Sequence, residues 1–380
     1  MNKAYKYRIY PNEEQKELFL KTFGCCRKIY NLMLADKIKS YEKTGSFCKC
    51  TPAQYKEEYL YLREVDSLAL ANVQLNLQSA FSNCFDKKRK KNCRFPKFKS
   101  KKCGKRKYTT NNQKETICLT DQSIKLPKVG IVKTKVHRKA PSDWILKSAT
   151  ISQSSDGKFY VSVLYEYEDN ISVVPISDNA IGLDYASDGL YVDSNGHKGT
   201  NHKYYRESQQ KLAKAQRRLS RKHGSKKNEK KSNNYIKQLN KVNRIYRHIS
   251  NQRNDNLHKI STEIANRYDV VCVESLNMSA MSNKGFGNGK ATLDNGYGLF
   301  LNMLEYKLQD RGKHFVKVDK WFPSSQLCNN CGTLHTEMKD LSNRIIKCDC
   351  GLTMSRDQNA AINIKKRRTT HIVCVIHHYQ

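Results

Sequence analysis

Hydrophobic residues recur at helical spacing in the first part of the chain. Residues 5–10 read as a short strand that Pro11 ends, and Asn12 is placed to cap a helix that Gly45 terminates. A second helical stretch is predicted from Pro52 to Lys90. The apolar positions that define the first helix are Leu18, Phe19, Phe23, Ile29, Tyr30, Leu32 and Met33.

Apolar and polar residues alternate between residues 108 and 168, which is the pattern of strands. Turn signals stand at 128–130 (KVG) and 155–157 (SDG). The segment predicts a small β-barrel or sandwich. The strand at 5–10 can join it, which would make the helices of 12–107 an insertion into the sheet.

From residue 178 onward the pattern predicts a mixed α/β region. A β-hairpin is expected at 181–199, and two basic helical segments at 203–222 and 231–267. The strand DVVCVES follows, then the glycine-rich loop GFGNGK. The remaining predicted elements are a helix at 296–311, a strand at 314–318, a cysteine module at about 325–352 and a helix at 356–367.

The charge of the chain points to a polyanionic partner. Seventy Lys and Arg residues face 35 Asp and Glu residues, which gives a net charge of +35. A ribosomal protein or a merely solubilised surface is the alternative. The sequence has no run of about 18 apolar residues and no secretory signal. Its 14 cysteines suit a reducing compartment. We therefore expect a cytoplasmic, nucleoid-associated protein without a membrane span.

Basic residues concentrate in the loop at 87–107 and in the helices at 203–267. Phe95 and Phe98 interleave with the charges of the loop, which suits stacking on bases between phosphate contacts. A disordered linker is the alternative for the loop, and a solvated face for the helices. Acidic residues are scarce there, which favours phosphate contact. The candidate contacts are Lys97, Lys99, Lys101, Lys102, Arg217, Arg218, Arg221, Arg247 and Arg253.

Three acidic residues stand in otherwise apolar surroundings. Asp184 follows a buried strand pattern, Glu274 ends the run VVCV, and Asp357 lies in the first turn of the last helix, whose expected N-cap is Ser355. Such carboxylates can hold two Mg²⁺ or Mn²⁺ ions about 4 Å apart for phosphoryl displacement. For any one of these acids taken alone, a structural role at a strand end or as a cap is the favoured interpretation. The neighbouring acids, assigned to turns, are Asp188, Asp193 and Asp294.

Four cysteines have the spacing of a zinc ribbon. Sixteen residues separate the pair CNNC from the pair CDC, and Gly332 and Gly351 follow the two pairs. The second pair is shorter than usual, so a degenerate finger that packs without metal is the alternative. The predicted zinc ligands are Cys328, Cys331, Cys348 and Cys350.

Together these segments resemble the TnpB family, the RNA-guided nucleases of IS200/IS605-type transposons and relatives of Cas12 effectors. The matching motifs in the second half are IGLDYASDGLYVDSNG, NQRNDNLHKIS, CVESLNM, FPSSQLCNNCG and CDCGLTMSRDQNAAINI. Those in the first half are YKYRIYPNEEQKELFLKTFGCCRKIYN, YLREVDSLALANVQLNLQSAF and RFPKFKSKK. The resemblance covers nearly the whole chain, and its motifs are specific in combination.

The resemblance implies a mixed α/β multidomain architecture. A RuvC nuclease domain of RNase H-like fold would occupy 176–324 and 353–368, split by a zinc-ribbon insertion at 325–352. A wedge β-barrel would comprise 1–11 and 108–175, a helical recognition lobe 12–107, and a tail 369–380. Asp184, Glu274 and Asp357 match the RuvC carboxylates, and the four cysteines match the zinc ligands. Ser355 departs from the family's usual Asp, and it is also a good N-cap.

We interpret the sequence as an RNA-guided DNA endonuclease that uses two Mg²⁺ ions and one Zn²⁺. Its expected partners are a guide RNA and a double-stranded DNA target, and a monomer is favoured. The protein would also read a short flanking DNA motif. A nuclease-inactive RNA-guided repressor and a transposase accessory protein are the alternatives. The predicted contacts to the flanking motif are Asn72, Gln74 and Gln78.

Overall fold

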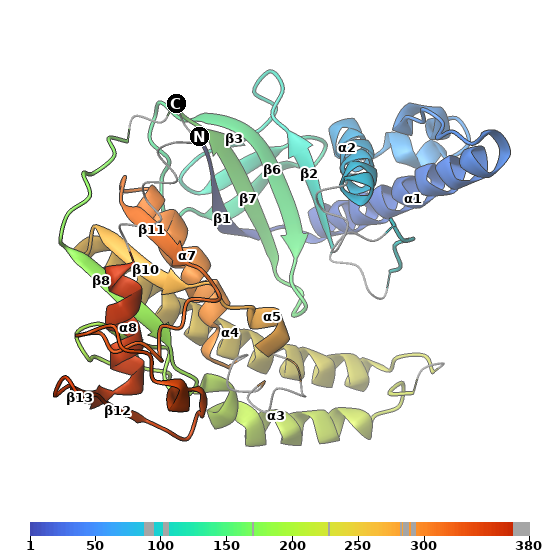
Figure 1. Cartoon of the computed structure of the whole chain (residues 1–380). Coiled ribbons are helices and arrows are strands. Elements are labelled where there is room, and N and C mark those ends of the chain that lie inside the picture. Colours follow the sequence, from blue (N-terminus) through green and yellow to red (C-terminus); the bar gives the residue numbers. More distant parts are fainter. Residues whose placement is uncertain are drawn as a thin grey trace. The chain divides into compact units, whose positions relative to one another are not determined.

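The computed structural model describes residues 1–86, 95–101, 106–168, 171–226, 229–281, 283, 289 and 294–367 (Figure 1). The chain folds as two compact units, Met1–Asp169 and Asn170–Gln380. Lys102, the terminal segment 368–380 and most of the loop GFGNGK lie outside the described residues. The interpretations of these parts therefore stay predictions.

The first unit contains a seven-stranded antiparallel sheet with the order β2-β6-β7-β1-β5-β4-β3. Strand β1 lies between β7 and β5, so the prediction that the first strand joins this sheet is confirmed. The helices between β1 and β2 are accordingly an insertion into the sheet. The strands are β1 (Asn2–Tyr10), β2 (Lys107–Asn111), β3 (Cys118–Leu119), β4 (Ser123–Leu126), β5 (Gly130–Lys135), β6 (Ile145–Gln153) and β7 (Phe159–Glu166).

The first helix begins and ends where its caps predict. Helix α1 (Glu13–Thr44) is capped by Asn12, whose side chain accepts a hydrogen bond from the amide of Gln15 at 2.8 Å. Gly45 ends the helix in the left-handed conformation with φ of 68°. The capping residues at its two ends therefore predicted the limits of this 32-residue helix.

The single helical stretch predicted from Pro52 to Lys90 is wrong. The chain forms two short 3₁₀ helices, η1 (Pro52–Lys56) and η2 (Leu60–Arg63), and then α2 (Ser67–Phe85). The break has a local cause at Asp66, which is extended and accepts a hydrogen bond from the amide of Leu68 at 3.0 Å. An Asp at this place starts a new helix instead of continuing the previous one.

The second unit contains a four-stranded sheet with the order β11-β10-β8-β9 (Figure 1). Strands β8 (Ala180–Tyr185), β10 (Val270–Glu274) and β11 (His314–Val318) are parallel, and β9 (Tyr191–Asp193) pairs with β8 as the predicted hairpin. The helices are α3 (Tyr204–Ser220), α4 (Asn233–Arg267), α5 (Met278–Met281), α7 (Tyr297–Gln309) and α8 (Arg356–Lys366). The mixed α/β class is confirmed.

Alternate residues of this sheet face different helices. Ile181, Leu183 and Val273 pack with α4 and α7, whereas Val270 and Cys272 pack with Ile364 of α8. The approach of α8 to β8 is very close at Gly182, where a Cβ atom would lie 2.0 Å from the carbonyl oxygen of Ala361. A residue without a side chain is therefore required there.

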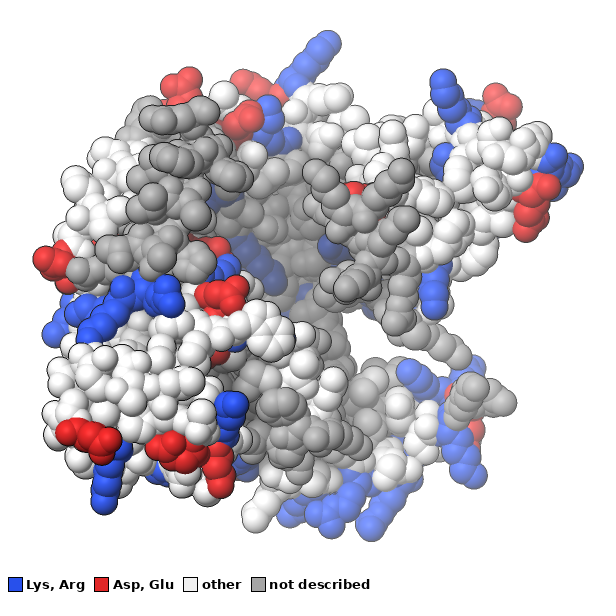
Figure 2. All heavy atoms as spheres, in the orientation of Figure 1, with Lys and Arg blue, Asp and Glu red and all other residues white. Residues whose placement is uncertain are grey.

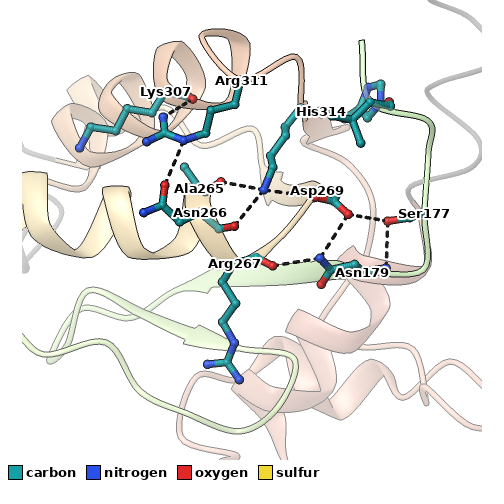
Figure 3. A network of polar contacts seen from close by, with 11 residues as sticks. Ser177, Asn179, Ala265, Asn266, Arg267, Asp269, Lys307, Arg311 and His314 are labelled. Carbon is teal, nitrogen blue, oxygen red and sulfur yellow. Dashed lines mark hydrogen bonds and ion pairs between the residues drawn. The ribbon is translucent and has the colours of Figure 1, made fainter. Parts of the chain in front are cut away.

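Polar contacts fix the amino ends of the parallel strands (Figure 3). The carboxylate of Asp269, just before β10, accepts hydrogen bonds from Ser177 at 2.9 Å and from Asn179 at 3.2 Å. Lys313 forms an ion pair with Asp269 at 3.2 Å and bonds the carbonyls of Ala265 and Asn266 at the end of α4. The Ser177 hydrogen bond is the largest of the effects that lower the pKa of Asp269. These contacts hold the amino ends of the parallel strands in place. The carboxyl ends of the same strands lie at the opposite edge of the sheet.

The cysteine module adds a small sheet of β12 (Ile345–Lys347) and β13 (Thr353–Ser355), with the 3₁₀ helix η5 (Thr336–Lys339) before it. Strand β13 leads directly into α8. Within the described ranges, no helix is long and apolar enough to cross a membrane.

Candidate functional site

Three acidic residues lie near the carboxyl edge of the sheet in the second unit. The parallel ladder between β8 and β10 pairs Leu183 with Val273, and Asp184 and Glu274 are the next residue on each strand. Asp357 lies in the first turn of α8, the helix that packs on β8. In open α/β sheets this edge is where ligands bind.

The electrostatics single out Asp184 among these acids. Burial raises the pKa of Asp184 well above its usual value, and the negative charges of Glu274 and Asp357 raise it further. Burial also raises the pKa of Glu274. Asp184 nevertheless keeps part of its surface open. Half-buried carboxylates that repel one another are stabilised by a cation, and oxygen ligands suit Mg²⁺ or Mn²⁺.

Helix α8 starts as the sequence predicts. The Ser355 hydroxyl accepts a hydrogen bond from the amide of Gln358 at 3.3 Å, which caps the helix. Asp357 is the second residue of the helix and is half-buried. The helix N-terminus carries partial positive charge, which favours an ionised carboxylate in the first turn. Ser355 thus leaves Asp357 available to a ligand.

Tyr297 is a neighbour of the carboxylates that the sequence did not single out. Its ring is fully buried and meets the Tyr185 ring edge-on, with 5.0 Å between the ring centroids. Its hydroxyl is buried and has no hydrogen-bond partner among the residues that the structure describes. Burial raises the pKa of this hydroxyl well above its usual value, and the charges of Asp184 and Glu274 add to the effect. An aromatic residue at the start of an apolar helix is usually interpreted as a core residue. Sequence reasoning therefore gave no role to this hydroxyl.

Asn295 holds Tyr297 in place. It accepts a hydrogen bond from the amide of Tyr297 at 3.0 Å. Its own amide group donates to the carbonyls of Ala186 at 3.4 Å and Gly189 at 3.3 Å. The start of α7 is therefore fastened to the turn that follows Asp184.

The neighbouring acids have other tasks. Asp193 accepts hydrogen bonds from two amides of its own turn, as predicted, and Asp188 is bonded to Lys198. The assignment of Asp294 to a turn is wrong. Asp294 is buried and accepts a hydrogen bond from the amide of Tyr205 at 3.0 Å, so it fastens the start of α3. The role of Asp294 depends on a residue far away in the sequence, so the local sequence pattern could not predict it.

The four predicted zinc ligands come together. All four sulfur atoms lie within 4.8 Å of one another, with 3.6 Å between those of Cys328 and Cys350 and 3.4 Å between those of Cys331 and Cys348. Four ligands at 2.3 Å in a tetrahedron stand about 3.8 Å apart, so the cluster fits zinc. A hydrogen bond with Thr333 lowers the pKa of Cys331 to about 6, which favours the thiolate.

The short second cysteine pair does not prevent this arrangement. Both loops turn back through a glycine in the left-handed conformation, Gly332 with φ of 80° and Gly351 with φ of 87°. The amide of Gly332 donates to the carbonyl of Cys328, and that of Gly351 to the carbonyl of Cys348. In both turns the glycine amide donates to the carbonyl of the first cysteine of the pair, across four residues in the first turn and three in the second, so the shorter pair closes a tighter turn.

Two asparagines of α8 bind the cysteine module to the carboxylate site. Asn359 donates to the carbonyl of Leu327 at 2.7 Å and accepts from the amide of Asn329 at 2.9 Å. Asn363 donates to the same carbonyl at 2.7 Å. These bonds join the loop that carries Cys328 to the helix that carries Asp357. Order in the module should therefore control the position of Asp357.

We expect Cys331→Ser to lower bound zinc and to reduce DNA cleavage by about tenfold or more. Loss of a ligand loosens the loop at 327–329, and α8 then loses the contacts that place Asp357. Metal analysis of the purified protein and a cleavage assay measure the two effects. Cys118→Ser, which alters an exposed cysteine of the first unit, is the matched control. Full cleavage by a zinc-free Cys331→Ser protein would contradict the coupling.

A basic groove runs between α3 and α4, with a volume of about 400 Å³. Of the predicted contacts Arg218 lines it, Arg217 and Arg221 are exposed nearby, and Arg247 and Arg253 are half-buried. Figure 2 shows Lys and Arg side chains gathered along this part of the second unit. The groove also contains four basic residues that sequence reasoning did not name: Lys211, Lys214, Lys241 and Arg244.

A second basic pocket of about 420 Å³ lies in the first unit between α1, α2, residues 99–101 and the start of β2. Of the residues predicted to contact nucleic acid, Asn72, Lys99 and Lys101 line this pocket, whereas Gln74 and Gln78 do not. Residues two apart on a helix point to nearly opposite faces, which separates Gln74 from Asn72. The lining residues that sequence reasoning missed include Arg27, Asn76, Arg106 and Lys107.

The segment before this pocket is held against α1. The Asn31 amide group donates to the carbonyl of Lys99 at 3.0 Å, and the Lys99 ammonium lies 3.5 Å from the centroid of the Tyr30 ring. Burial of that ammonium lowers the pKa of Lys99, although the residue as a whole is exposed. Phe95 packs edge-on against Phe81, whereas Phe98 remains 58% exposed. Of the two aromatics predicted to stack on bases, only Phe98 keeps most of its ring open.

Three family models match the chain. They are described as "Helix-turn-helix domain" over residues 1–46, "Probable transposase" over 162–284 and "Cas12f1-like, TNB domain" over 297–364. In the structure the first match comprises β1 and the single helix α1. The third match begins at Tyr297 and contains the whole cysteine module.

Two curated relatives align with almost the full length of the chain. A protein of Streptomyces pristinaespiralis named "Putative RNA-guided DNA endonuclease" is 33% identical, over 96% of this chain and 89% of its own length. The Escherichia coli K12 protein of the same description, InsQ, is 29% identical over 95% of this chain and 91% of its own length. The cryo-EM structure of a Cas12f1–sgRNA–target DNA complex matches with a TM-score of 0.55 and 13% identity, covering 96% of this chain and 98% of that one. That likeness concerns the fold.

Proposed function

The chain belongs to the TnpB family, and on this basis we propose that it is an RNA-guided DNA endonuclease of the RuvC type. The observation that carries the proposal is that the charges of Glu274 and Asp357 act on the half-buried Asp184 at one sheet edge, in a chain with net charge +35. The basic surface holds nucleic acid, and the acidic site cuts it. The relatives' names support this reading.

The proposal assigns a task to each part of the chain. Residues 176–324 and 353–368 form the nuclease domain of RNase H-like fold, and 325–352 form its zinc-binding insertion. Residues 1–11 and 108–175 form the wedge barrel, and 12–107 the recognition lobe. The basic groove between α3 and α4 and the pocket beside α2 contact phosphates of the guide RNA and the DNA. Base pairing with the RNA supplies the sequence of the target.

Asp184, Glu274 and Asp357 would hold two Mg²⁺ ions. When bound, such ions polarise the phosphodiester and stabilise the charge of the attacking and leaving oxygens. The chain's own residues position the site. Gly182 lets α8 approach β8, Ser355 caps α8, and the asparagines of α8 fasten it to the zinc module. The all-oxygen donor set and the mutual repulsion of the acids fit divalent cations.

The function is tested with the protein purified together with RNA transcribed from its own locus. We expect a defined RNA to co-purify and to direct cleavage of DNA that contains its complement, only in the presence of Mg²⁺. DNA without the complement is the control. Guided binding without any cutting would favour the repressor instead, and joining of a second DNA end would favour transposase chemistry.

The pocket beside α2 is our candidate reader of the flanking DNA motif. Asn72 and Asn76 are four residues apart on one face of α2, and an asparagine amide can pair with an adenine edge. We expect Asn76→Ala to weaken guided binding to DNA with the native motif by about tenfold and to relax motif preference. Binding across a library of flanking sequences measures this. Gln74→Ala, outside the pocket, is the matched control, and equal effects of both would refute the assignment.

Tyr297 is our candidate for a hydroxyl that orients the metal-binding carboxylates. The hydroxyl has no hydrogen-bond partner among the described residues, so we propose that it bonds a carboxylate once that carboxylate has bound a metal. We expect Tyr297→Phe to weaken Mn²⁺ binding by roughly tenfold, because groups that hydrogen-bond metal ligands commonly contribute that much. Titration of the protein with Mn²⁺ by electron paramagnetic resonance measures it without any reaction. Tyr191→Phe on β9 is the control. Unchanged Mn²⁺ affinity with raised stability would instead mark the hydroxyl as an unpaired group that the fold merely tolerates.

A further inference from the structure

Trp321 is the most exposed large hydrophobic residue in the described parts of the chain. Its side chain is 81% exposed. The chain has only two tryptophans, and the other, Trp144, stacks on Tyr167 with 4.2 Å between ring centroids. Full exposure of a large amphipathic ring on a protein surface is typical of binding surfaces.

Trp321 follows the strand that pairs with the strand carrying Glu274. It follows the end of β11 by three residues, and the last pair of the ladder between β11 and β10 joins Val318 to Glu274. The amide of Ser275 donates to the carbonyl of Val318 at 3.1 Å, which continues this register. Three residues span at most about 11 Å. A DNA strand bound at the proposed cutting site could therefore reach the Trp321 ring within a few nucleotides.

The turn that carries the ring is fixed on both sides. The Asp319 carboxylate accepts a hydrogen bond from the amide of Trp321 at 2.7 Å. Phe322 packs inward against the core that β10, β11 and α8 share. The Lys320 ammonium lies 4.6 Å from the centroid of the Trp321 ring. The turn thus packs the partly buried Phe322 ring against the core and presents the Trp321 ring, together with a cation, to solvent.

An aromatic ring beside a lysine matches the chemistry of a nucleotide. A base stacks on the ring face, and a phosphate meets the ammonium. Every base has a π-face, so such a contact tolerates any sequence, which a guided nuclease requires of its cutting site. A contact with a second copy of the chain would need a larger apolar patch around the ring. The neighbours of Trp321 in the chain are Lys320 and the inward-facing Phe322.

We propose that Trp321 is a stacking platform for a base of the single DNA strand that enters the carboxylate site, with Lys320 at the adjoining phosphate. The inference rests on the proposed nuclease function and extends it to a residue outside the carboxylates and the zinc module. The platform fixes the strand near the cutting position. It therefore affects cleavage of the loaded strand, whereas guide pairing determines binding of the target.

The test compares Trp321→Ala with Trp321→Phe in the protein–guide RNA complex. We expect Trp321→Ala to cut a guided DNA about tenfold or more slowly under single-turnover conditions, because stacking contributes about that factor per base. Target binding should be unchanged, and Trp321→Phe should retain most of the rate. Leu341→Ala, which removes a 68% exposed side chain of the cysteine module, is the control.

Fluorescence supplies a readout that does not depend on cutting. In a Trp144→Phe protein, Trp321 is the sole tryptophan, and guided DNA added in Ca²⁺ should quench it saturably. Wild-type cleavage by Trp321→Ala, or fluorescence that guided DNA leaves unchanged, overturns the platform alone. If the Trp321 fluorescence instead falls as the protein concentration is raised without DNA, the platform is also overturned and the ring is assigned to self-association. A wild-type protein that never cuts defeats the nuclease function instead.

Discussion

Asp184→Asn is expected to lower guided DNA cleavage by roughly 10³-fold or more while leaving guide RNA and target binding unchanged. The substitution keeps the shape of the side chain and removes the charge that a cation would meet. Effects of this size are typical when one member of a catalytic group is lost. The basic groove and the pocket beside α2 contain none of the three acids, so binding should persist.

The same substitution should stabilise the protein when no divalent cation is present. Burial and two like charges raise the folded-state pKa of Asp184, so the ionised carboxylate opposes folding. The wild type is most stable below the unfolded-state pKa and loses stability as the pH rises through the raised folded-state pKa. Asn does not titrate. The melting temperature of Asp184→Asn should therefore exceed that of the wild type increasingly as the pH rises, and match it in acid.

Mg²⁺ reverses this order. A ligand that binds only the folded state raises the melting temperature, so Mg²⁺ should stabilise the wild type and leave Asp184→Asn nearly unchanged. Thermal unfolding with and without Mg²⁺ measures both effects. Asp188→Asn, an exposed acid of the same hairpin that is bonded to Lys198, is the matched control and should behave as wild type. Near wild-type cleavage by Asp184→Asn would refute the active-site assignment.

Gly182→Ala is expected to reduce cleavage by about 10²-fold and to lower the free energy of unfolding by about 1–3 kcal/mol. The added Cβ would lie 2.0 Å from the carbonyl of Ala361 and 2.8 Å from the amide nitrogen of Lys365, both backbone atoms of α8. The helix must move away from β8, and overpacked cores cost about this free energy. Since β8 carries Asp184 and α8 carries Asp357, the two acids separate. Displacements of about 1 Å at reacting groups can cost 10²-fold in rate.

The control for this prediction is Gly298→Ala in helix α7 of the same unit. Its Cβ would meet only the Met278 side chain, at 3.5 Å, an ordinary contact. Alanine is favoured over glycine within a helix by about 0.5–1 kcal/mol, so this variant should be as stable as the wild type or more so. Denaturant unfolding and a cleavage assay distinguish the two variants. Equal cleavage by both would show that α8 tolerates displacement.

Local chemistry in the sequence determined many elements of this protein and pointed to its candidate zinc site. Asn12 and Gly45 mark the two ends of α1, and Ser355 caps α8. The spacing of four cysteines predicted a cluster that the structure confirms. These features depend on residues a few positions apart, so the sequence displays them directly. Asp184 and Glu274 could be placed at one edge because parallel strands put their carboxyl ends together.

Tertiary structure alone decided the features that depend on residues far apart in the chain. The buried Tyr297 hydroxyl lies near the acids because Asn295 fastens α7 to the turn after Asp184. The bonds from Asn359 to the cysteine loop join two segments that share no local pattern. Asn72 enters a basic pocket and Gln74 does not, since the packing of α1, α2 and β2 selects one face of a polar helix. The sequence names the groups that can act, and packing between distant segments decides which of them meet.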